Sequence, residues 1–449
     1  MIKKKGLIFF LIFLILNNCS FDSKTGIWSG SEKEKRKISE IEKEQKQIID
    51  IDKIYSSENA FSKEVLLASS IVISKPRKNS SWEVPGLNNQ NYLGNIYLPN
   101  ANNIFFKKKI GKNKFSTSKI MTTLLISKNN IIFSDDTGTV FNIRDDGKIN
   151  WKINIYKKLY KKIYKSLVYS IYKNNIYIAD NIGFIYVINI KTGKVIWIKN
   201  YGVPLKSTIK VFDDKIFLTD QDNRIICLKI SDGSKIWDIV SISSFIKSQN
   251  LLSLAVTKNG DLISINSAAD IFKIKGDSGE IYWSRNTSDT LYAHDLDFFI
   301  SSDIVIDENE IFFSAGQSIF SYNIDNGNVN WQNEVSSAGA PIVDKKNIFF
   351  VSENGYFVIL DKNSGKIISS TNILKVLKKK KQMTKITGFI MGSGKIYAVT
   401  LNGYLIVSSA LSGKVEYFKK IGDPIASAPI ISNGKLYIIT ENSRIVGFN

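Results

Sequence analysis

The chain has 449 residues, with 61 lysines and arginines against 41 acidic residues, and its formal net charge is +20 at pH 7. The excess is lysine spread along the whole chain, so the arginine-rich patches with interleaved aromatic residues that are typical of nucleic-acid binding are missing. The chain has a single histidine, and one histidine beside two aspartates makes a poor metal site.

The N-terminal residues have the organisation of an export signal. Lysines at residues 3–5 precede the apolar run Leu7–Leu16, which is short for a membrane span, and Cys19 follows. The pattern predicts a lipoprotein signal peptide over residues 1–18, with Cys19 lipidated after cleavage. Asn18 replaces the small residue that usually precedes such a cysteine, and an ordinary secretory signal or a retained anchor is the alternative.

A charged stretch separates this signal from the rest of the chain. Residues 31–47 balance Lys and Arg against Glu and contain few apolar residues. Such a composition does not bury enough surface to fold alone. We expect residues 19–81 to form a lipid-anchored charged tether, and the alternative is that residues 31–47 form a partner-binding helix.

A phrase of turn, glycine and aromatic residue then recurs seven times, with successive glycines 38 to 48 residues apart. The glycines are Gly147, Gly193, Gly233, Gly279, Gly327, Gly365 and Gly413. Four residues after each glycine stand Trp151, Trp197, Trp237, Trp283, Trp331, Ser369 and Tyr417. A fixed period of this size indicates an array of similar units, each too small to bury its own apolar face, so neighbouring units must stack.

Each period contains four β-rich runs. In the sixth unit these are Ala340–Asp344, Asn347–Val351, Tyr356–Leu360 and Lys366–Ser369. Asn, Asp and Gly separate them, as hairpin turns with positive φ require. Four antiparallel strands per unit predict the blades of an all-β fold, the β-propeller.

The predicted first strands number eight, which gives eight blades. They are Ile120–Ser127, Ser166–Tyr172, Leu205–Phe212, Leu251–Thr257, Phe299–Ile306, Ala340–Asp344, Lys385–Met391 and Ile425–Ser432. The last unit stops at Asn449 after three strands, and Asn103–Ile110 has the composition to supply the fourth. Pairing of the N- and C-terminal strands would close the ring and hide its edges. We expect the propeller to span residues 82–449; an open solenoid of hairpins is the alternative.

Single residues in the repeats have structural interpretations. The tryptophan is expected to begin the fourth, outermost strand and to pack between adjacent blades, with ligand stacking as the alternative. Cys227 lies in an apolar run without a partner and is expected to be an inert core thiol. The lysine clusters Tyr156–Lys165 and Leu377–Lys381 are either solvated connections or contacts for anionic lipid or an acidic partner.

No constellation for catalysis is recognisable. His294 stands beside Asp295 and Asp297 without a second cluster to complete a metal site, and no Ser-His-Asp set or phosphate-binding loop occurs. We therefore expect no catalytic, cofactor-binding or metal-binding residues and no enzyme activity.

The unit pattern resembles the PQQ-like repeat of eight-bladed propellers. Within that class, Trp82–Asn95, Gly202–Ser207 and Ala426–Tyr437 are similar to the lead-in, one inter-blade joint and the final blade of the BamB family. That resemblance implies a non-catalytic scaffold lipoprotein of the outer-membrane β-barrel assembly machinery. It would dock on the barrel-forming subunit, BamA, as a monomer within a hetero-complex, anchored at the periplasmic face of the outer membrane.

The resemblance also implies partner contacts in loops between blades. By order along the chain they map to Leu251 and Leu252 and to Asp295 and Asp297. The alternatives are core packing for the two leucines and solvated turns for the two aspartates.

Quinoprotein alcohol dehydrogenases carry the same repeat and define the alternative function, a small-molecule-binding or quinone-dependent propeller enzyme. The chain lacks their pair of adjacent cysteines and the haem motif Cys-x-x-Cys-His. Both differences favour the scaffold.

Overall fold

The computed structural model describes residues 61–67, 70–115, 124–241, 251–287, 300–378 and 384–449, together with the short stretches 20–21, 28–29, 36 and 39–40. The chain forms two compact units, which are Met1–Ser56 with Asn154–Tyr164, and Ser57–Ile153 with Lys165–Asn449. In the smaller unit β1 (Ser20–Phe21) pairs with β2 (Trp28–Ser29), and a 3-10 helix, η2, spans Lys158–Lys162.

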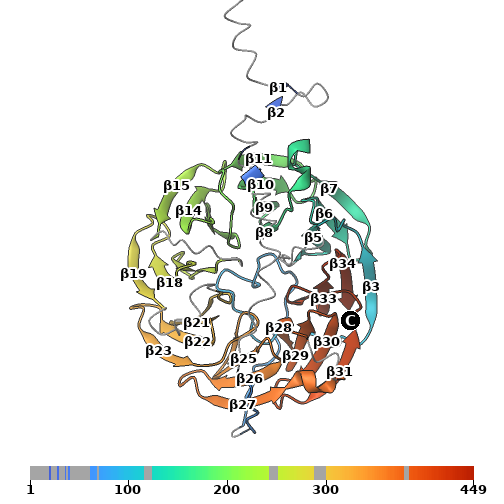
Figure 1. Ribbon diagram of the computed structural model, residues 1–449, viewed down its shortest axis with the longest axis vertical. Helices are drawn as coiled ribbons and strands as arrows, with labels where there is room; N and C mark the ends of the chain where they lie inside the picture. Colours follow the sequence, from blue (N-terminus) through green and yellow to red (C-terminus); the bar gives the residue numbers. More distant parts are fainter. Residues whose placement is uncertain are drawn as a thin grey trace, which may run out of the picture. The chain divides into compact units, whose positions relative to one another are not determined.

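The larger unit is a ring of eight four-stranded antiparallel sheets, which confirms the predicted eight-bladed β-propeller (Figure 1). Blades one to three are β4 (Leu125–Ser127), β5 (Asn130–Ser134), β6 (Val140–Arg144), β7 (Ile149–Ile153); β8 (Leu167–Tyr172), β9 (Asn175–Asp180), β10 (Phe184–Asn189), β11 (Val195–Asn200); and β12 (Lys210–Phe212), β13 (Lys215–Thr219), β14 (Arg224–Lys229), β15 (Lys235–Val240). Blades four and five are β16 (Leu254–Val256), β17 (Leu262–Ile265), β18 (Asp270–Ile274), β19 (Ile281–Asn286); and β20 (Val305–Asp307), β21 (Glu310–Ala315), β22 (Ser318–Asn323), β23 (Val329–Asn333).

Blades six and seven are β24 (Ile342–Asp344), β25 (Asn347–Val351), β26 (Tyr356–Asp361), β27 (Ile367–Asn372); and β28 (Ile386–Gly392), β29 (Lys395–Thr400), β30 (Tyr404–Ser409), β31 (Val415–Lys420). A short 3-10 helix, η5 (Ile373–Val376), follows β27. The eighth blade contains β32 (Ile430–Ser432), β33 (Lys435–Ile439), β34 (Arg444–Phe448) and β3 (Ile104–Lys109).

The two ends of the propeller sequence close the ring as the sequence predicts. β3 pairs antiparallel with β34, with Lys107 opposite Val446. Beyond the strand ends, Asn103 N–H donates to the Asn449 carbonyl at 3.1 Å, and Asn449 N–H donates back at 3.0 Å. The fourth strand of the last blade therefore comes from the beginning of the propeller sequence, and β34 is not left as an edge strand.

The predicted first strands are too long in most blades. Residues 205–212 are expected as one strand, but the strand is only Lys210–Phe212, and residues 425–432 reduce to Ile430–Ser432. In the first blade the described strand is Leu125–Ser127, and residues 120–123 of the expected strand lie outside the described residues. The preceding residues in blades three and eight form the connection from one blade to the next. Their apolar side chains are buried there: Leu205 makes only an isolated bridge to Asp220, and Ile209 makes none, so burial without a continuous ladder misled the sequence pattern.

The repeated tryptophan lies at the third position of the fourth strand, two residues later than predicted, and it packs between blades as expected. Its indole N–H donates to a backbone carbonyl of the following blade at 2.8–3.2 Å in all five copies. The repeated glycine of that following blade lies against the ring. A Cβ added to Gly193 would lie 2.8 Å from the Trp151 indole, and one added to Gly233 would lie 2.7 Å from Trp197.

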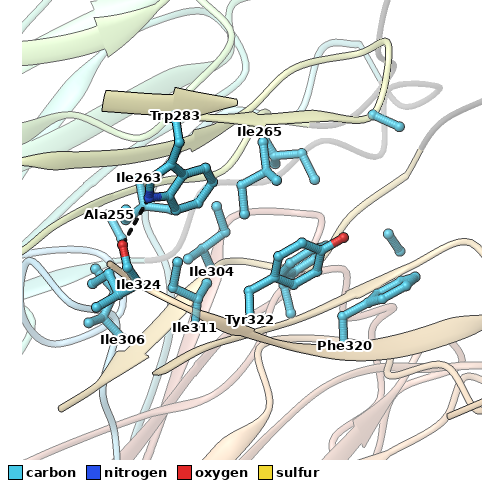
Figure 2. Packing of buried hydrophobic residues seen from close by; sticks show 14 residues of the cluster. Ala255, Ile263, Ile265, Trp283, Ile304, Ile306, Ile311, Phe320, Tyr322 and Ile324 are labelled. Atoms are coloured by element: carbon cyan, nitrogen blue, oxygen red, sulfur yellow. Dashed lines mark hydrogen bonds between the residues drawn. The ribbon is translucent and has the colours of Figure 1, made fainter. Parts of the chain in front are cut away.

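The interior between blades is apolar. Between the fourth and fifth blades, Trp283 covers isoleucines of both sheets and donates to the Ile324 carbonyl at 3.0 Å (Figure 2). Phe313 stacks on Phe320 in the same cluster, with ring centroids 5.3 Å apart. Cys227 in β14 is fully buried and free, and burial raises the pKa of its thiol to about 12, so it is the inert core thiol expected from the sequence.

Candidate functional site

The ring has two faces with different connections. Because the strands of a blade are antiparallel, the turns between first and second strands, such as 308–309 and 345–346, share one face with the turns between third and fourth strands. We call this the turn face. The connections from one blade to the next, such as 201–209 and 421–429, share the other face, which we call the linker face.

Residues 74–98, here the axial segment, cross the middle of the ring (Figure 1). The segment forms a hydrogen bond with the first strand of every blade. In blades one to four, Trp82 N–H donates to Ile126 at 2.7 Å, Ile171 N–H donates to Glu83 at 2.7 Å, Asn89 Nδ2 donates to Val211 at 2.9 Å, and Val256 N–H donates to Asn89 at 2.8 Å.

The remaining blades are bonded in the same manner. Ile306 N–H donates to Gln90 at 2.9 Å, Ser74 N–H donates to the Asp344 carboxylate at 2.7 Å, Ile96 N–H donates to Met391 at 3.3 Å, and Asn79 Nδ2 donates to Ile431 at 2.7 Å. Most of these partners lie in the last residues of the first strands, at the turn face. The chain itself therefore fills the middle of the ring at that face.

A buried lysine holds the axial segment in place. Lys210 of β12 has no exposed surface, and its Nζ donates to the Pro85 carbonyl at 3.0 Å, the Asn88 carbonyl at 3.2 Å and Asn91 Oδ1 at 2.5 Å. Burial lowers the pKa of Lys210 to about 8, and Asp303 opposes the shift. Three acceptors match the three donors of an ammonium group, so this lysine is a latch for the segment.

A polar hollow of about 470 Å³ lies between the axial segment and blades five and six. Its walls include Lys362, whose Nζ lies 2.7 Å from Asp307 and 3.1 Å from Glu310. Burial lowers the pKa of Lys362, but the two ion pairs outweigh it, so the pKa is raised overall. Burial and the nearby Asp307 and Asp344 raise the pKa of Tyr92 on the opposite wall. The Lys362 ammonium in the hollow is thus paired with carboxylates, and Tyr92 is protonated at neutral pH.

The sequence-predicted site residues are described only in part. Leu252 is buried, with 3% of its surface exposed, and its N–H donates to the Lys206 carbonyl at 2.5 Å, while Leu251 packs half-buried on the core between blades two and three. Asp295 and Asp297 lie outside the described residues, as do Cys19 and His294. The two leucines thus lie in the connection between blades three and four.

Sequence reasoning missed the axial segment and its latch. Residues 61–81, assigned to the tether, also reach the ring, as the bonds of Ser74 and Asn79 show. The run Asn88-Asn89-Gln90-Asn91 is a usable signal, because the last three amide side chains donate to carbonyls of blades three to five and the first donates to Tyr92 within the segment. A lysine within the apolar run of β12 is a second signal.

The described residues contain neither a clustered metal site nor a membrane-spanning helix. They contain no group of three or more His, Cys, Asp or Glu side chains positioned to hold a metal ion. Within the same residues, no helix has the length and apolar character of a membrane span. Of the lysine clusters, 379–381 lie outside the described residues, and most of the other belongs to the smaller unit.

Comparison with known proteins gives a family match over half of the chain. The model of the family described as "Outer membrane protein assembly factor BamB", PQQ_2, matches residues 136–371. The outer membrane protein assembly factor BamB of Yersinia pestis is 19% identical over 279 residues, which cover 61% of this chain and 69% of that protein.

Solved structures agree in fold. BamB from Moraxella catarrhalis superposes with a TM-score of 0.65 at 12% identity, covering 77% of this chain and 99% of that one. Quinohemoprotein alcohol dehydrogenase from Comamonas testosteroni gives a TM-score of 0.63 at 10% identity, covering 82% and 80%. At such identities the likeness extends to the propeller alone.

Proposed function

Because the chain belongs to the BamB family of PQQ-like repeat propellers, we propose that it is a non-catalytic scaffold of the outer-membrane β-barrel assembly machinery. It docks on the barrel-forming subunit, a BamA-like protein, as a single copy within a hetero-complex. A rigid ring presents connections at fixed spacing, and a stable contact of this kind buries about 1,200–2,000 Å².

The observation that carries the docking geometry is the axial segment. Its bonds occupy the turn face along all eight first strands, so the linker face is the end of the ring that remains for a partner. Leu251 and Leu252 follow blade three and precede blade four at that face, and Asp295 and Asp297 fall between blades four and five in the sequence. With Leu252 buried, Leu251 and the two aspartates are the residues we assign to direct contact.

Anchoring completes the proposal. Residues 1–18 act as a lipoprotein signal peptide, Cys19 carries the lipid, and residues 19–81 lead to a propeller over 82–449 at the periplasmic face of the outer membrane. The test is labelling of cells with radioactive palmitate. The wild-type chain is expected to carry label, and Cys19→Ser to lose it; label on Cys19→Ser would contradict the anchor.

The docking test is co-purification of the tagged chain from solubilised outer membranes. Asp295→Lys with Asp297→Lys is expected to reduce recovery of the barrel-forming subunit at least tenfold. The matched control is Glu280→Lys with Glu308→Lys, which makes the same charge change in the same two blades at exposed turn-face positions. Lysine already occupies the positive-φ position of Glu308 in other blades, as at Lys345 and Lys173. Absence of the subunit from the wild-type sample, or equal loss in both variants, would refute the proposal.

The fold match to quinohemoprotein dehydrogenases supports a second candidate, a small-molecule-binding or quinone-dependent enzyme. The axial segment argues against it, since the chain itself occupies the turn-face mouth of the ring. An absorbance titration with pyrroloquinoline quinone and calcium decides the matter: saturable binding with turnover of an alcohol would favour the enzyme.

A further inference from the structure

The outer edge of the sixth blade differs from those of the other seven. Every other outermost strand exposes at least two residues, whereas β27 exposes none. Ser369 stands where five blades have tryptophan, and Ser369 and Ser370 are 4% and 1% exposed. Two small buried serines on an outer strand indicate that another part of the chain covers this edge.

Residues 61–67, here the edge segment, provide the cover. Val65 N–H donates to the Ser370 carbonyl at 3.0 Å, and Ser370 N–H donates to the Val65 carbonyl at 2.9 Å, as in an antiparallel ladder. Figure 1 shows this dark blue part of the chain beside β27. In its described part the segment makes one such bridge. An extended peptide is therefore added to the blade edge through a single pair of ladder hydrogen bonds.

Side chains hold the segment at two points four residues apart. The Phe61 ring meets Tyr356 edge to face, with centroids 5.7 Å apart, and its carbonyl accepts from Asn354 at 2.7 Å. Tyr356 Oη donates to the Ser62 carbonyl at 2.9 Å, and Glu64 pairs with Lys375 at 2.9 Å. Phe61 and Val65 are half-buried, but the residues between them are exposed. Recognition therefore uses backbone groups plus an aromatic and a β-branched anchor.

We propose that the outer edge of blade six is a binding site for an extended polypeptide strand, and that the edge segment is its resident occupant. Strand addition to an open edge takes affinity from main-chain bonds and specificity from alternate side chains. In its described part the resident bridges only one residue of β27, and its other contacts are the Phe61 ring, side-chain hydrogen bonds and an exposed ion pair. Leu66 beyond the bridge is 92% exposed, so a longer strand that pairs along all of β27 makes more main-chain bonds and displaces it. Resting on the proposed function, we identify the incoming strand as an apolar-alternating segment of an unfolded outer-membrane barrel.

The first test opens the site. The probe is a fluorescent peptide with the sequence of residues 58–67, measured by anisotropy on the purified full chain in a Cys19→Ser background. Val65→Pro removes the N–H that bonds to Ser370 and is expected to bind the probe at least tenfold more tightly than the parent chain. Leu66→Pro is the matched control, because it favours an extended Val65 and leaves both bridge bonds intact. Equal affinity for all three chains would overturn the proposal.

The second test closes the site. Val65 and Ser370 form a hydrogen-bonded antiparallel pair, about 5.5 Å apart at Cα, which suits a disulfide. Val65→Cys with Ser370→Cys, once oxidised, is expected to lose probe binding and to regain it on reduction. Binding that is the same in both redox states would show that the probe sits elsewhere and would refute the site.

The third test addresses the incoming strand. A ten-residue peptide alternating valine and tyrosine with serine is expected to displace the probe from Val65→Pro, while the same peptide with prolines at two alternate positions is not. If neither peptide competes, the edge serves only its own segment and the proposal fails. Co-purification of the oxidised variant with the barrel-forming subunit is measured in parallel, so failure of the edge and failure of the scaffold role are read separately.

Discussion

The repeated glycine and the repeated tryptophan act as one contact across a blade boundary. The glycine has positive φ in every copy, +69° at Gly193 for example, and the indole of the preceding blade packs where a side chain would begin. The positive φ disfavours a Cβ and the indole leaves no room for one, so the glycine suits the turn and is needed for the packing of its neighbour.

Gly193→Ala is expected to destabilise the protein by about 2–4 kcal/mol, from left-handed backbone strain and from overpacking against Trp151. The matched control is Gly394→Ala, because its φ is +75° and an added Cβ meets nothing within 4 Å, so only the strain applies. Urea unfolding measures both free energies. If the two variants lose the same stability, the indole contact is not the reason for the glycine.

Lys210 gives the protein a defined pH dependence. Burial lowers the pKa in the folded state to about 8, below the value near 10.5 in the unfolded chain. Between these values the unfolded state binds more protons, so the contribution of Lys210 to the free energy of unfolding rises with pH. Relative to Lys210→Met, the wild type is expected to gain on the order of 1–3 kcal/mol from pH 7.5 to pH 10.

Subtraction of the variant removes contributions from other groups, among them Lys165, whose pKa burial also lowers to about 8. Parallel stability curves for wild type and Lys210→Met across that range would show that the lysine does not titrate as described.

At the scale of elements, the closing strand imitates the repeat. Phe106 of β3 is 7% exposed and lies where the other blades have tryptophan, and a Cβ on Gly147 of the first blade would be 2.7 Å from its ring. An aromatic residue and a glycine thus meet at the seam as they do at other boundaries.

Phe106→Ala is expected to lower the free energy of unfolding by about 3–5 kcal/mol, the range for a buried phenylalanine. Phe418→Ala on the outer strand β31 makes the same change at a side chain that is 43% exposed, and should cost below about 1 kcal/mol. Chemical denaturation compares the two. Similar small losses at both positions would mean that Phe106 does not secure the seam.

The blade strands and the closing pair were predictable from the sequence because turn residues recur with the period and each strand is locally marked. The first-strand bounds were not, since residues such as Ile209 are buried without ladder partners. The strand-like docking of Val65 on Ser370 has no local signal, because its partner is distant in the chain and only the fold brings the two together.

At the scale of the molecule, the axial segment couples all eight blades. Deletion of residues 82–98 removes bonds to most of the first strands and is expected to lower the melting temperature by on the order of 10 °C, at about 1 kcal/mol for each lost hydrogen bond. Deletion of residues 2–56, which belong to the other compact unit, is the control and should leave the transition near its wild-type temperature. Scanning calorimetry that finds equal melting in both deletions would refute the coupling.

The candidate site was predictable only in outline. The family resemblance implied partner contacts in the connections between blades. Leu252, in one of these connections, is a buried packing residue. Neither the axial segment nor the latch at Lys210 follows from periodicity. The segment is an irregular stretch whose bonds run to strands of every repeat, and Lys210 bonds to that stretch.

The seam between β3 and β34 also bears on the order of folding. Lys107 and its partner Val446 lie at opposite ends of the propeller sequence, so their pairing must wait until the whole chain is available, and the entropy cost of closing so long a loop makes it a late step. Premature pairing of β3 with the wrong blade would trap a ring of the wrong size.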